Sequence, residues 1–248
     1  MQNQYNSAFA VIGGNVPTAI ADRLRDFFHH VILLPADEKI DVPVSHHPDM
    51  NFAVVRDTLI TDENYYLCNA KEAIDRICFL GGFKLALSKD RRSADYPHDV
   101  GFNALILGNI LIGRLDALSG NILALAEECG LKPINVKQGY TACSTLSVPS
   151  KNLIFTADRG IASVCERHGA DVVRIPDKTG ITLSGYNCGF IGGCTGVWED
   201  TVFFYGDPQE HPSLEPMCQV LEKRGIETVP LSADMLTDYG GIRIFPIA

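Results

Sequence analysis

Two cysteines, Cys188 and Cys194, stand among glycines in the stretch GYNCGFIGGCTGVW, residues 185–198. Thiols in such a loop suit three roles: half of a metal site, a nucleophile with a neighbouring group, or plain buried thiols. Cys-x5-Cys is not a usual zinc spacing, which argues against a zinc site made from this pair alone. Which of the other roles applies depends on the elements that position these thiols.

Composition and charge limit the partners of the chain. Hydrophobic residues make up 46% of the 248 residues, and the net charge is −9. The acidic balance argues against nucleic-acid or anionic-membrane binding and is compatible with a cationic small ligand. No apolar run approaches the roughly 18 residues of a membrane span, and the N-terminus lacks signal-peptide features. We expect a cytoplasmic protein whose eight cysteines stay reduced.

A repeated pattern organises the chain. In five segments, a β-rich run ends at Gly or Asp, a segment of helical periodicity follows, and a second β-rich run comes last. These segments are 8–35, 57–88, 109–137, 151–176 and 200–232. A further apolar or Gly-rich stretch precedes the last four of them, at 44–55, 96–107, 139–148 and 185–198. The first segment has none, but a lone strand-like segment, 238–248, ends the chain.

The two incomplete ends complement each other. If the C-terminal strand joins the N-terminal unit, five ββαβ modules close into a ring that leaves no open sheet edge. The sequence therefore predicts a five-bladed, pseudo-fivefold α/β propeller that forms a single domain over 1–248. Its approximate repeats are 43–89, 95–137, 138–178, 183–232, and 237–248 plus 8–36. An ordinary α/β sheet with accidental similarity between segments is the alternative.

Equivalent positions of such modules face a common axis. Alignment on Asp62, Asp158 and Asp207 sets His47 opposite Asp99, Cys143 and Gly192, and sets Asp49 opposite Gly101, Thr145 and Cys194. The same level of the last unit falls near Arg243. The opening stretch is then the axial strand of the fourth module. Thiols, imidazoles and carboxylates that are distant in the sequence would converge at one mouth of the ring, as an active site requires.

This arrangement resembles the pentein superfamily of guanidino-group-modifying enzymes. The resemblance rests on the five modules and on HPDMNF, where His47, Asp49 and Phe52 match a His-x-Asp-x-x-Phe pattern. The superfamily includes deiminases, dimethylarginine dimethylaminohydrolase, amidinotransferases and non-catalytic ribosome anti-association factors. The resemblance implies a thiolate that attacks a guanidinium carbon. It also implies His47 as the acid/base and Asp49 and Asp99 as the carboxylates that bind the guanidinium, without a cofactor.

The C-terminal segment departs from the family pattern. In the enzymes a glycine-rich strand near the C-terminus, such as GGGPRC, carries the nucleophilic cysteine. DYGGIRIFPIA matches this strand at Arg243, but Ile244 stands where the cysteine should be. The candidates for a relocated nucleophile are, in order, Cys194, Cys143 and Cys188.

The predicted function is a cysteine-dependent hydrolase or amidinotransferase that acts on a guanidino or amine-bearing small molecule. Its expected catalytic residues are His47, Cys194 and Cys143, and its expected substrate-binding residues are Asp49, Asp99 and Arg243. The missing C-terminal cysteine favours an alternative, a non-catalytic propeller that binds a ligand or a protein partner. A metal-binding propeller is a third hypothesis. His47 and Asp49 also fit a strand start and a local turn, and the cysteines also fit ordinary buried thiols.

Overall fold

The structure is a computed structural model that describes residues 5–177 and 180–248. Residue 1, where the expected domain begins, and residue 178, where one expected repeat ends, lie outside the described residues. The described residues form five sheets of three strands each. The fold is therefore a mixed α/β fold built from five small sheets.

Each sheet combines two strands and a helix from one predicted strand–helix–strand segment with one additional strand. The first sheet contains β1 (Ala8–Gly13), β2 (His30–Leu34) and β15 (Arg243–Pro246), with α1 (Thr18–Arg25) between β1 and β2. The second contains β3 (Phe52–Val55), β4 (Thr58–Asp62) and β5 (Lys84–Ser88), with α3 (Glu63–Tyr65) and α4 (Lys71–Gly81). The third contains β6 (Leu105–Leu107), β7 (Ile110–Gly113) and β8 (Lys132–Asn135), with α5 (Gly120–Glu128).

The remaining two sheets repeat this plan. The fourth contains β9 (Thr145–Val148), β10 (Leu153–Thr156) and β11 (Asp171–Arg174), with α6 (Arg159–Arg167). The fifth contains β12 (Thr195–Trp198), β13 (Thr201–Phe204) and β14 (Glu227–Pro230), with α7 (Glu215–Lys223). A single-turn helix, α2 (Pro48–Asn51), precedes β3. Short 3₁₀ or π segments are η1 (Val42–Val44), η2 (Tyr66–Ala70), η3 (Pro149–Lys151), η4 (Gly192–Cys194), η5 (Pro208–Glu210) and η6 (Pro212–Leu214).

The strand order is the same in every sheet. The middle strand pairs antiparallel with the strand that lines the interior and parallel with the strand that follows the helix. In the first sheet the antiparallel partner is β15, where Ile244 pairs with Ala10 of β1. The C-terminal strand thus pairs with the N-terminal unit, as the sequence predicts.

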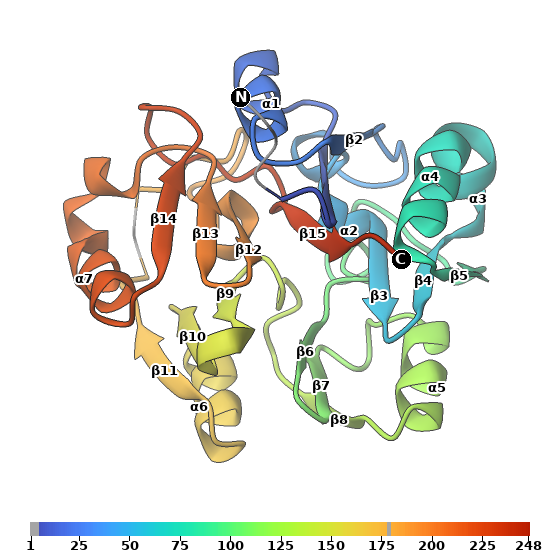
Figure 1. Cartoon of the computed structure of the whole chain (residues 1–248). Coiled ribbons are helices and arrows are strands. Elements are labelled where there is room, and N and C mark those ends of the chain that lie inside the picture. Colours follow the sequence, from blue (N-terminus) through green and yellow to red (C-terminus); the bar gives the residue numbers. More distant parts are fainter. Residues whose placement is uncertain (1–4, 178–179) are drawn as a thin grey trace.

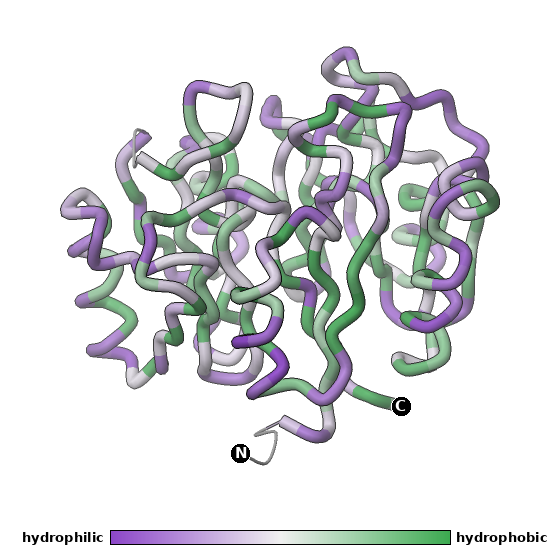
Figure 2. Tube along the Cα trace, turned by 90° about the horizontal axis from the view of Figure 1, so that it is seen from above, coloured by the Kyte–Doolittle hydropathy of each residue, from purple (hydrophilic) through white to green (hydrophobic). Residues whose placement is uncertain are grey.

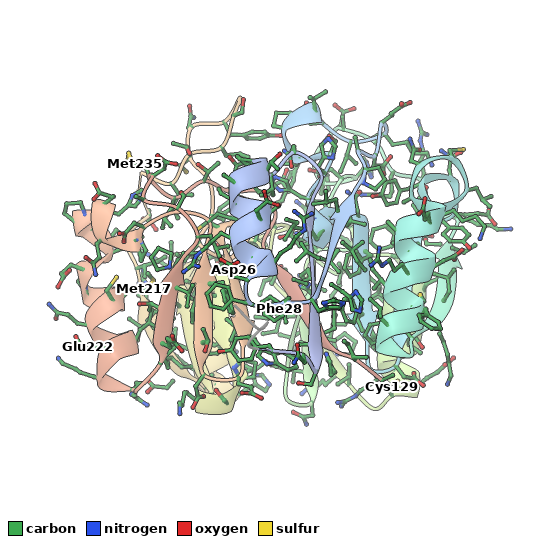
Figure 3. All side chains as sticks on the ribbon, turned by 45° about the horizontal axis from the view of Figure 1, so that its top comes forward. Asp26, Phe28, Cys129, Met217, Glu222 and Met235 are labelled. Carbon is green, nitrogen blue, oxygen red and sulfur yellow. The ribbon has the colours of Figure 1, made fainter. Side chains whose placement is uncertain are left out.

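Hydrophobic strands and amphipathic helices account for the layers. In Figure 1, β3, β6, β9, β12 and β15 face the middle of the molecule, whereas α1, α4, α5, α6 and α7 lie at its periphery. Figure 2 shows hydrophobic strands inside and helices of mixed hydropathy outside. In α7, the buried Met217 faces the sheet, whereas the exposed Glu222 points away from it (Figure 3). The helices therefore bury one face against the sheets and leave the other to solvent.

Helix ends follow capping chemistry that the sequence carries. The side chain of Asp158 accepts a hydrogen bond from the Ile161 N–H at 2.8 Å at the start of α6. Gly82 ends α4 with a φ of 63°, in the left-handed region that glycine tolerates. No helix within the described ranges is both long enough and apolar enough to cross a membrane.

Candidate functional site

One cavity, with a volume of about 290 Å³, lies among the five interior strands. β3, β6, β9, β12 and β15 all contribute residues to its walls. Most of the residues that line it are apolar, among them Phe52, Val54, Phe102, Ile106, Val197 and Phe245. Two charged residues, Asp49 and Arg243, line the cavity at the end where β3 and β15 begin. The cavity therefore combines apolar walls with one charged end.

A thiol and a carboxylate meet beside this charged end. Asp49 lies in α2, and its Oδ2 accepts a hydrogen bond from the Cys143 thiol at 2.8 Å. Asn103 holds both groups, because its Nδ2 lies 3.0 Å from the Cys143 sulfur and donates to the Asp49 carbonyl at 3.2 Å. Its Oδ1 accepts from the Ala142 N–H at 2.7 Å. Asp49, Asn103 and Cys143, which we call the thiol–carboxylate cluster, are all buried and come from three modules.

Burial controls the protonation of this cluster. Loss of hydration raises the pKa of Asp49 to about 7, although the hydrogen bond from Cys143 and the charge of Arg243 oppose this shift. Burial, together with the charges of Asp49 and Asp238, raises the pKa of Cys143 well above its usual value. The resting pair is therefore a protonated thiol beside a carboxyl group that exchanges its proton near neutral pH.

Arg243 is the cationic member of the charged end. It is the first residue of β15, and its side chain is partly buried. Burial lowers the pKa of its guanidinium, whereas the charges of Asp49 and Cys143 act in the opposite direction. Arg243 remains cationic at physiological pH, since an arginine pKa lies far above 7. Its charge therefore balances the carboxylate form of Asp49 across the end of the cavity.

His47 lies near Asp238. The distance from its Nδ1 to Oδ1 of Asp238 is 3.8 Å, which is too long for a hydrogen bond. Burial, with a smaller contribution from the His46 charge, lowers the pKa of His47 to about 3, so its ring is neutral at physiological pH. Its Nε2 has no hydrogen-bond partner among the described residues. Burial also raises the pKa of Asp238 to about 6, against hydrogen bonds from the Phe190 and Gly240 N–H groups.

Two glycines allow His47 and Asp238 to pack closely against the backbone. Gly240 has a φ of 83°, and a Cβ at this position would collide with His47. A Cβ at Gly193 would collide with the carboxyl group of Asp238. The Gly-Gly pairs at 192–193 and 240–241 therefore allow side chains of neighbouring modules to pack against the backbone.

Asp99 lies in a different environment from Asp49. It is buried but does not line the cavity, and its Oδ2 accepts a hydrogen bond from the Tyr140 hydroxyl at 2.6 Å. The Tyr140 ring packs against Tyr96 and Phe190, with centroids 5.4 and 5.9 Å away. Burial raises the pKa of Asp99, against the hydrogen bond from Tyr140. The structure thus places Asp99 against an aromatic cluster rather than against the Cys143 thiol.

Cys194 and Cys188 are placed differently from Cys143. Cys194 ends η4, is fully buried in the largest apolar core, and donates its thiol hydrogen to the Ile191 carbonyl at 3.2 Å. Burial, with the charge of Asp238, raises its pKa well above the usual value. Cys188 lies partly buried in the loop before η4. The stretch 185–198 is a strand only over Thr195–Trp198, so neither cysteine lies on it.

The register of the modules differs from the expected one. The sequence alignment set Cys143 opposite His47. Strand pairing instead sets Cys143 level with Met50, three residues further along the chain. The connection between β9 and β10 spans four residues, whereas that between β3 and β4 spans two. The longer turn accounts for two of these three positions. The third arises because Asp158 lies two residues after Thr156, whereas Asp62 lies one residue after the equivalent Thr61.

Two residues of the site were not singled out from the sequence. Asn103 reads as an ordinary residue in GFNALIL, and Asp238 as a turn residue before Gly240 and Gly241. Both lie in the segment that precedes an interior strand. The repeat predicts that these segments face the common axis of the modules. A search of that level for amides and carboxylates would have found them. Over residues 5–177 and 180–248, no three or more His, Cys, Asp or Glu side chains are grouped so as to hold a metal ion.

Comparison with known proteins places the chain in a family. The model of a family described as "Family of unknown function (DUF6873)" matches residues 11–243. The chain belongs to this family. No curated protein matches the sequence.

Solved structures show which fold this DUF6873 member has. A citrulline complex of dimethylarginine dimethylaminohydrolase from Pseudomonas aeruginosa matches at 12% identity and a TM-score of 0.55, over 92% of each chain. An inosamine-phosphate amidinotransferase from Streptomyces griseus matches at 14% identity and a TM-score of 0.56, over 97% of this chain and 93% of the other. An amidinotransferase of saxitoxin biosynthesis from Microseira wollei matches at 11% identity and a TM-score of 0.61, over 99% of this chain and 96% of the other. The DUF6873 chain has the pentein fold, and the resemblance seen in its sequence is confirmed at the level of fold.

Proposed function

We propose that the protein is a cysteine-dependent enzyme of the hydrolase or amidinotransferase type that acts on a guanidino or amine-bearing small molecule. The observation that carries this proposal is the 2.8 Å hydrogen bond from the Cys143 thiol to Asp49, which lines the charged end of the cavity. A thiol becomes a nucleophile when a neighbouring base takes its proton. Cys143 is therefore the nucleophile of this proposal, and Asp49 is its base.

Asp49 also takes the acid/base role that the family resemblance implies for His47. A group with a pKa of about 7 both accepts and returns a proton near neutral pH, whereas His47, with a pKa of about 3, does not donate one there. Asn103 positions the thiol and the backbone of Asp49. We assign His47 and Asp238 to the packing around this pair, and Asp99 to the aromatic cluster.

The proposed reaction has two steps. The Cys143 sulfur bonds to the guanidinium carbon while its proton passes to Asp49. The bond from that carbon to one nitrogen then breaks, and the departing amine takes the proton from Asp49. Water or an acceptor amine next attacks the carbon, gives up a proton to Asp49 and displaces the sulfur, and the thiol is restored when Asp49 returns that proton.

The direct test measures release of amine from a panel of guanidino compounds by wild type, Cys143→Ser and Cys68→Ser. Cys68 is an exposed thiol in the π-helical segment η2 and serves as the control. The proposal expects turnover in wild type and in Cys68→Ser, and a loss of at least a hundredfold in Cys143→Ser. Equal rates in all three proteins would remove Cys143 from the mechanism.

Two observations favour a second function. Ile244 stands where the pentein enzymes carry their C-terminal cysteine, and Cys143 is buried with a raised pKa. A non-catalytic propeller that binds a small ligand in the same cavity agrees with both facts. Binding of a ligand without turnover by wild type would favour this second function.

Closure of the five modules into a ring forms part of the proposal. Pairing of β15 with β1 and the contribution of all five interior strands to one cavity support it.

A further inference from the structure

The charged end of the cavity carries two groups of opposite charge, Asp49 and Arg243, that share no hydrogen bond with each other. Asp49 Oδ1 is buried and has no hydrogen-bond partner among the described residues, whereas Oδ2 receives the Cys143 thiol. Within the described part of the chain, Arg243 interacts with Asp49 by charge without a hydrogen bond between them. A buried polar group without a partner costs free energy, which a ligand regains when it supplies the missing bond.

The other polar side chains near this end are already occupied. The hydroxyl of Thr145 donates to the Thr141 carbonyl at 2.9 Å, and that of Thr195 donates to the Ile191 carbonyl at 3.0 Å. The recognition of a ligand at this end therefore depends on one carboxylate and one guanidinium.

The residues that line the remaining walls are mostly apolar, with the Ser147 hydroxyl among them, and the walls are short. Each interior strand has three or four residues, so the wall extends about 10–13 Å along it, at roughly 3.3 Å per residue. The volume of about 290 Å³ lies at the lower end of ligand pockets, which span roughly 300–1,000 Å³. The cavity thus has room for a small molecule with one apolar group.

We infer that this cavity binds a free α-amino acid with an apolar side chain. Its ammonium group is placed against Asp49, its carboxylate against Arg243, and its side chain along the walls formed by Phe52, Phe102 and Phe245. A simple amine would leave the Arg243 guanidinium without a hydrogen-bonded anion, and a simple carboxylate would leave Asp49 Oδ1 without a hydrogen-bond donor. A zwitterion satisfies both charges at once. The inference rests on the proposed function for the choice of an amine-bearing ligand, but it does not require thiol chemistry.

The test is isothermal titration calorimetry of the wild-type protein at pH 8, where Asp49 is ionised. L-phenylalanine and L-leucine are compared with 2-phenylethylamine, which lacks the carboxylate, with 3-phenylpropionate, which lacks the amine, and with L-glutamate. We expect both apolar amino acids to bind at least tenfold more tightly than any of the other three compounds. No binding of L-phenylalanine and L-leucine, or equal binding of the truncated analogues, would overturn the inference.

Variants locate the site. Ala104 lines the apolar wall, so Ala104→Leu should weaken binding at least tenfold by filling the cavity, whereas Ala73→Leu on α4 should leave it unchanged. Arg243→Met should remove the preference for L-phenylalanine over 2-phenylethylamine. Retention of full affinity in Ala104→Leu would place the ligand elsewhere and contradict the inference.

Cys143→Ser separates this inference from the proposed function. Binding of L-phenylalanine to this variant with wild-type affinity, with no turnover of any compound by wild type, would support the inference and contradict the enzymatic proposal. Turnover of guanidino compounds without any amino-acid binding would support the enzymatic proposal and contradict the inference.

Discussion

Cys143 and Asp49, which are 94 residues apart in the sequence, meet at 2.8 Å between Sγ and Oδ2. The contact joins two modules, and its Asp49 member lines the charged end of a cavity to which all five interior strands contribute. Its chemistry follows from burial, which keeps the proton on the thiol and raises the pKa of the carboxyl group to about 7. Changes to these residues therefore have measurable effects on stability as well as on activity.

Asp49→Asn should change how stability depends on pH. Folded Asp49, with a pKa of about 7, holds a proton that the unfolded chain releases above about pH 4, so its contribution to stability falls as the pH rises through this window. The variant lacks this loss. We expect its free energy of unfolding, relative to wild type, to rise by about 3 kcal/mol between pH 4.5 and 8. Urea denaturation at both pH values measures the difference, and Asp22→Asn on the surface is the control. If the free energies of unfolding of Asp49→Asn and wild type changed in parallel with pH, the raised pKa of Asp49 would be refuted.

His47→Gln should have the opposite pH dependence. The neutral His47 has a folded pKa of about 3, whereas a histidine in the unfolded chain takes a proton below about pH 6.5. Wild type therefore loses stability as the pH falls from about 6.5 towards 3, and the variant lacks that loss. We expect the stability of the variant relative to wild type to be about 2–3 kcal/mol higher at pH 4.5 than at pH 7.5. The exposed His168→Gln is the control, and a pH-independent difference for His47→Gln would show that His47 is not held neutral.

Asn103→Ala should destabilise the fold. The buried amide bonds to Asp49, Cys143 and Ala142, and its removal leaves their polar groups without partners. We expect a loss of about 2–4 kcal/mol in the free energy of unfolding. Asn121→Ala on the exposed face of α5 should cost less than about 0.5 kcal/mol. Equal melting temperatures for the two variants would mean that the amide does not hold the cluster.

Phe245→Ala tests the pairing of the C-terminal strand. Phe245 of β15 packs against Phe9, Phe52 and Phe83, with ring centroids 5.6, 6.2 and 5.3 Å away. Because the side chain is only partly buried, we expect a loss of about 2–3 kcal/mol, below that of a fully buried phenylalanine. Phe79→Ala, whose side chain is 84% exposed, is the control. A loss as small as that of Phe79→Ala would argue against docking of β15 in this position.

The repeat predicted most of the fold, because each module carries its own hydrophobic periodicity and turn residues. All five strand–helix–strand segments contain the expected elements, and 238–248 contains β15, which pairs with β1. The register was harder to predict from the sequence, because it depends on turn lengths. The four-residue turn before β10 contributes two of the three positions that separate His47 from Met50, the residue level with Cys143.

The site was predicted only in part. The axial level brought His47, Asp49 and Cys143 into one region, but partners at that level depend on side-chain directions that periodicity does not give. For this reason the sequence did not predict that Asn103 contacts Cys143 or that Asp238 lies near His47. The neutral state of His47 depends on burial, which the sequence pattern HPDMNF does not reveal.

The measurement that tests the central claim most directly is alkylation by 2-chloroacetamidine compared with 2-chloroacetamide at pH 7.5, with the modified cysteine identified by peptide mass. The two reagents have nearly the same size, but only the amidine is cationic and is attracted to Asp49. The account predicts selective modification of Cys143 by the amidine, at least tenfold faster than by the amide, and loss of this preference in Asp49→Asn. Equal rates for both reagents, or modification confined to the exposed Cys68, would contradict a nucleophilic Cys143 with a carboxylate base.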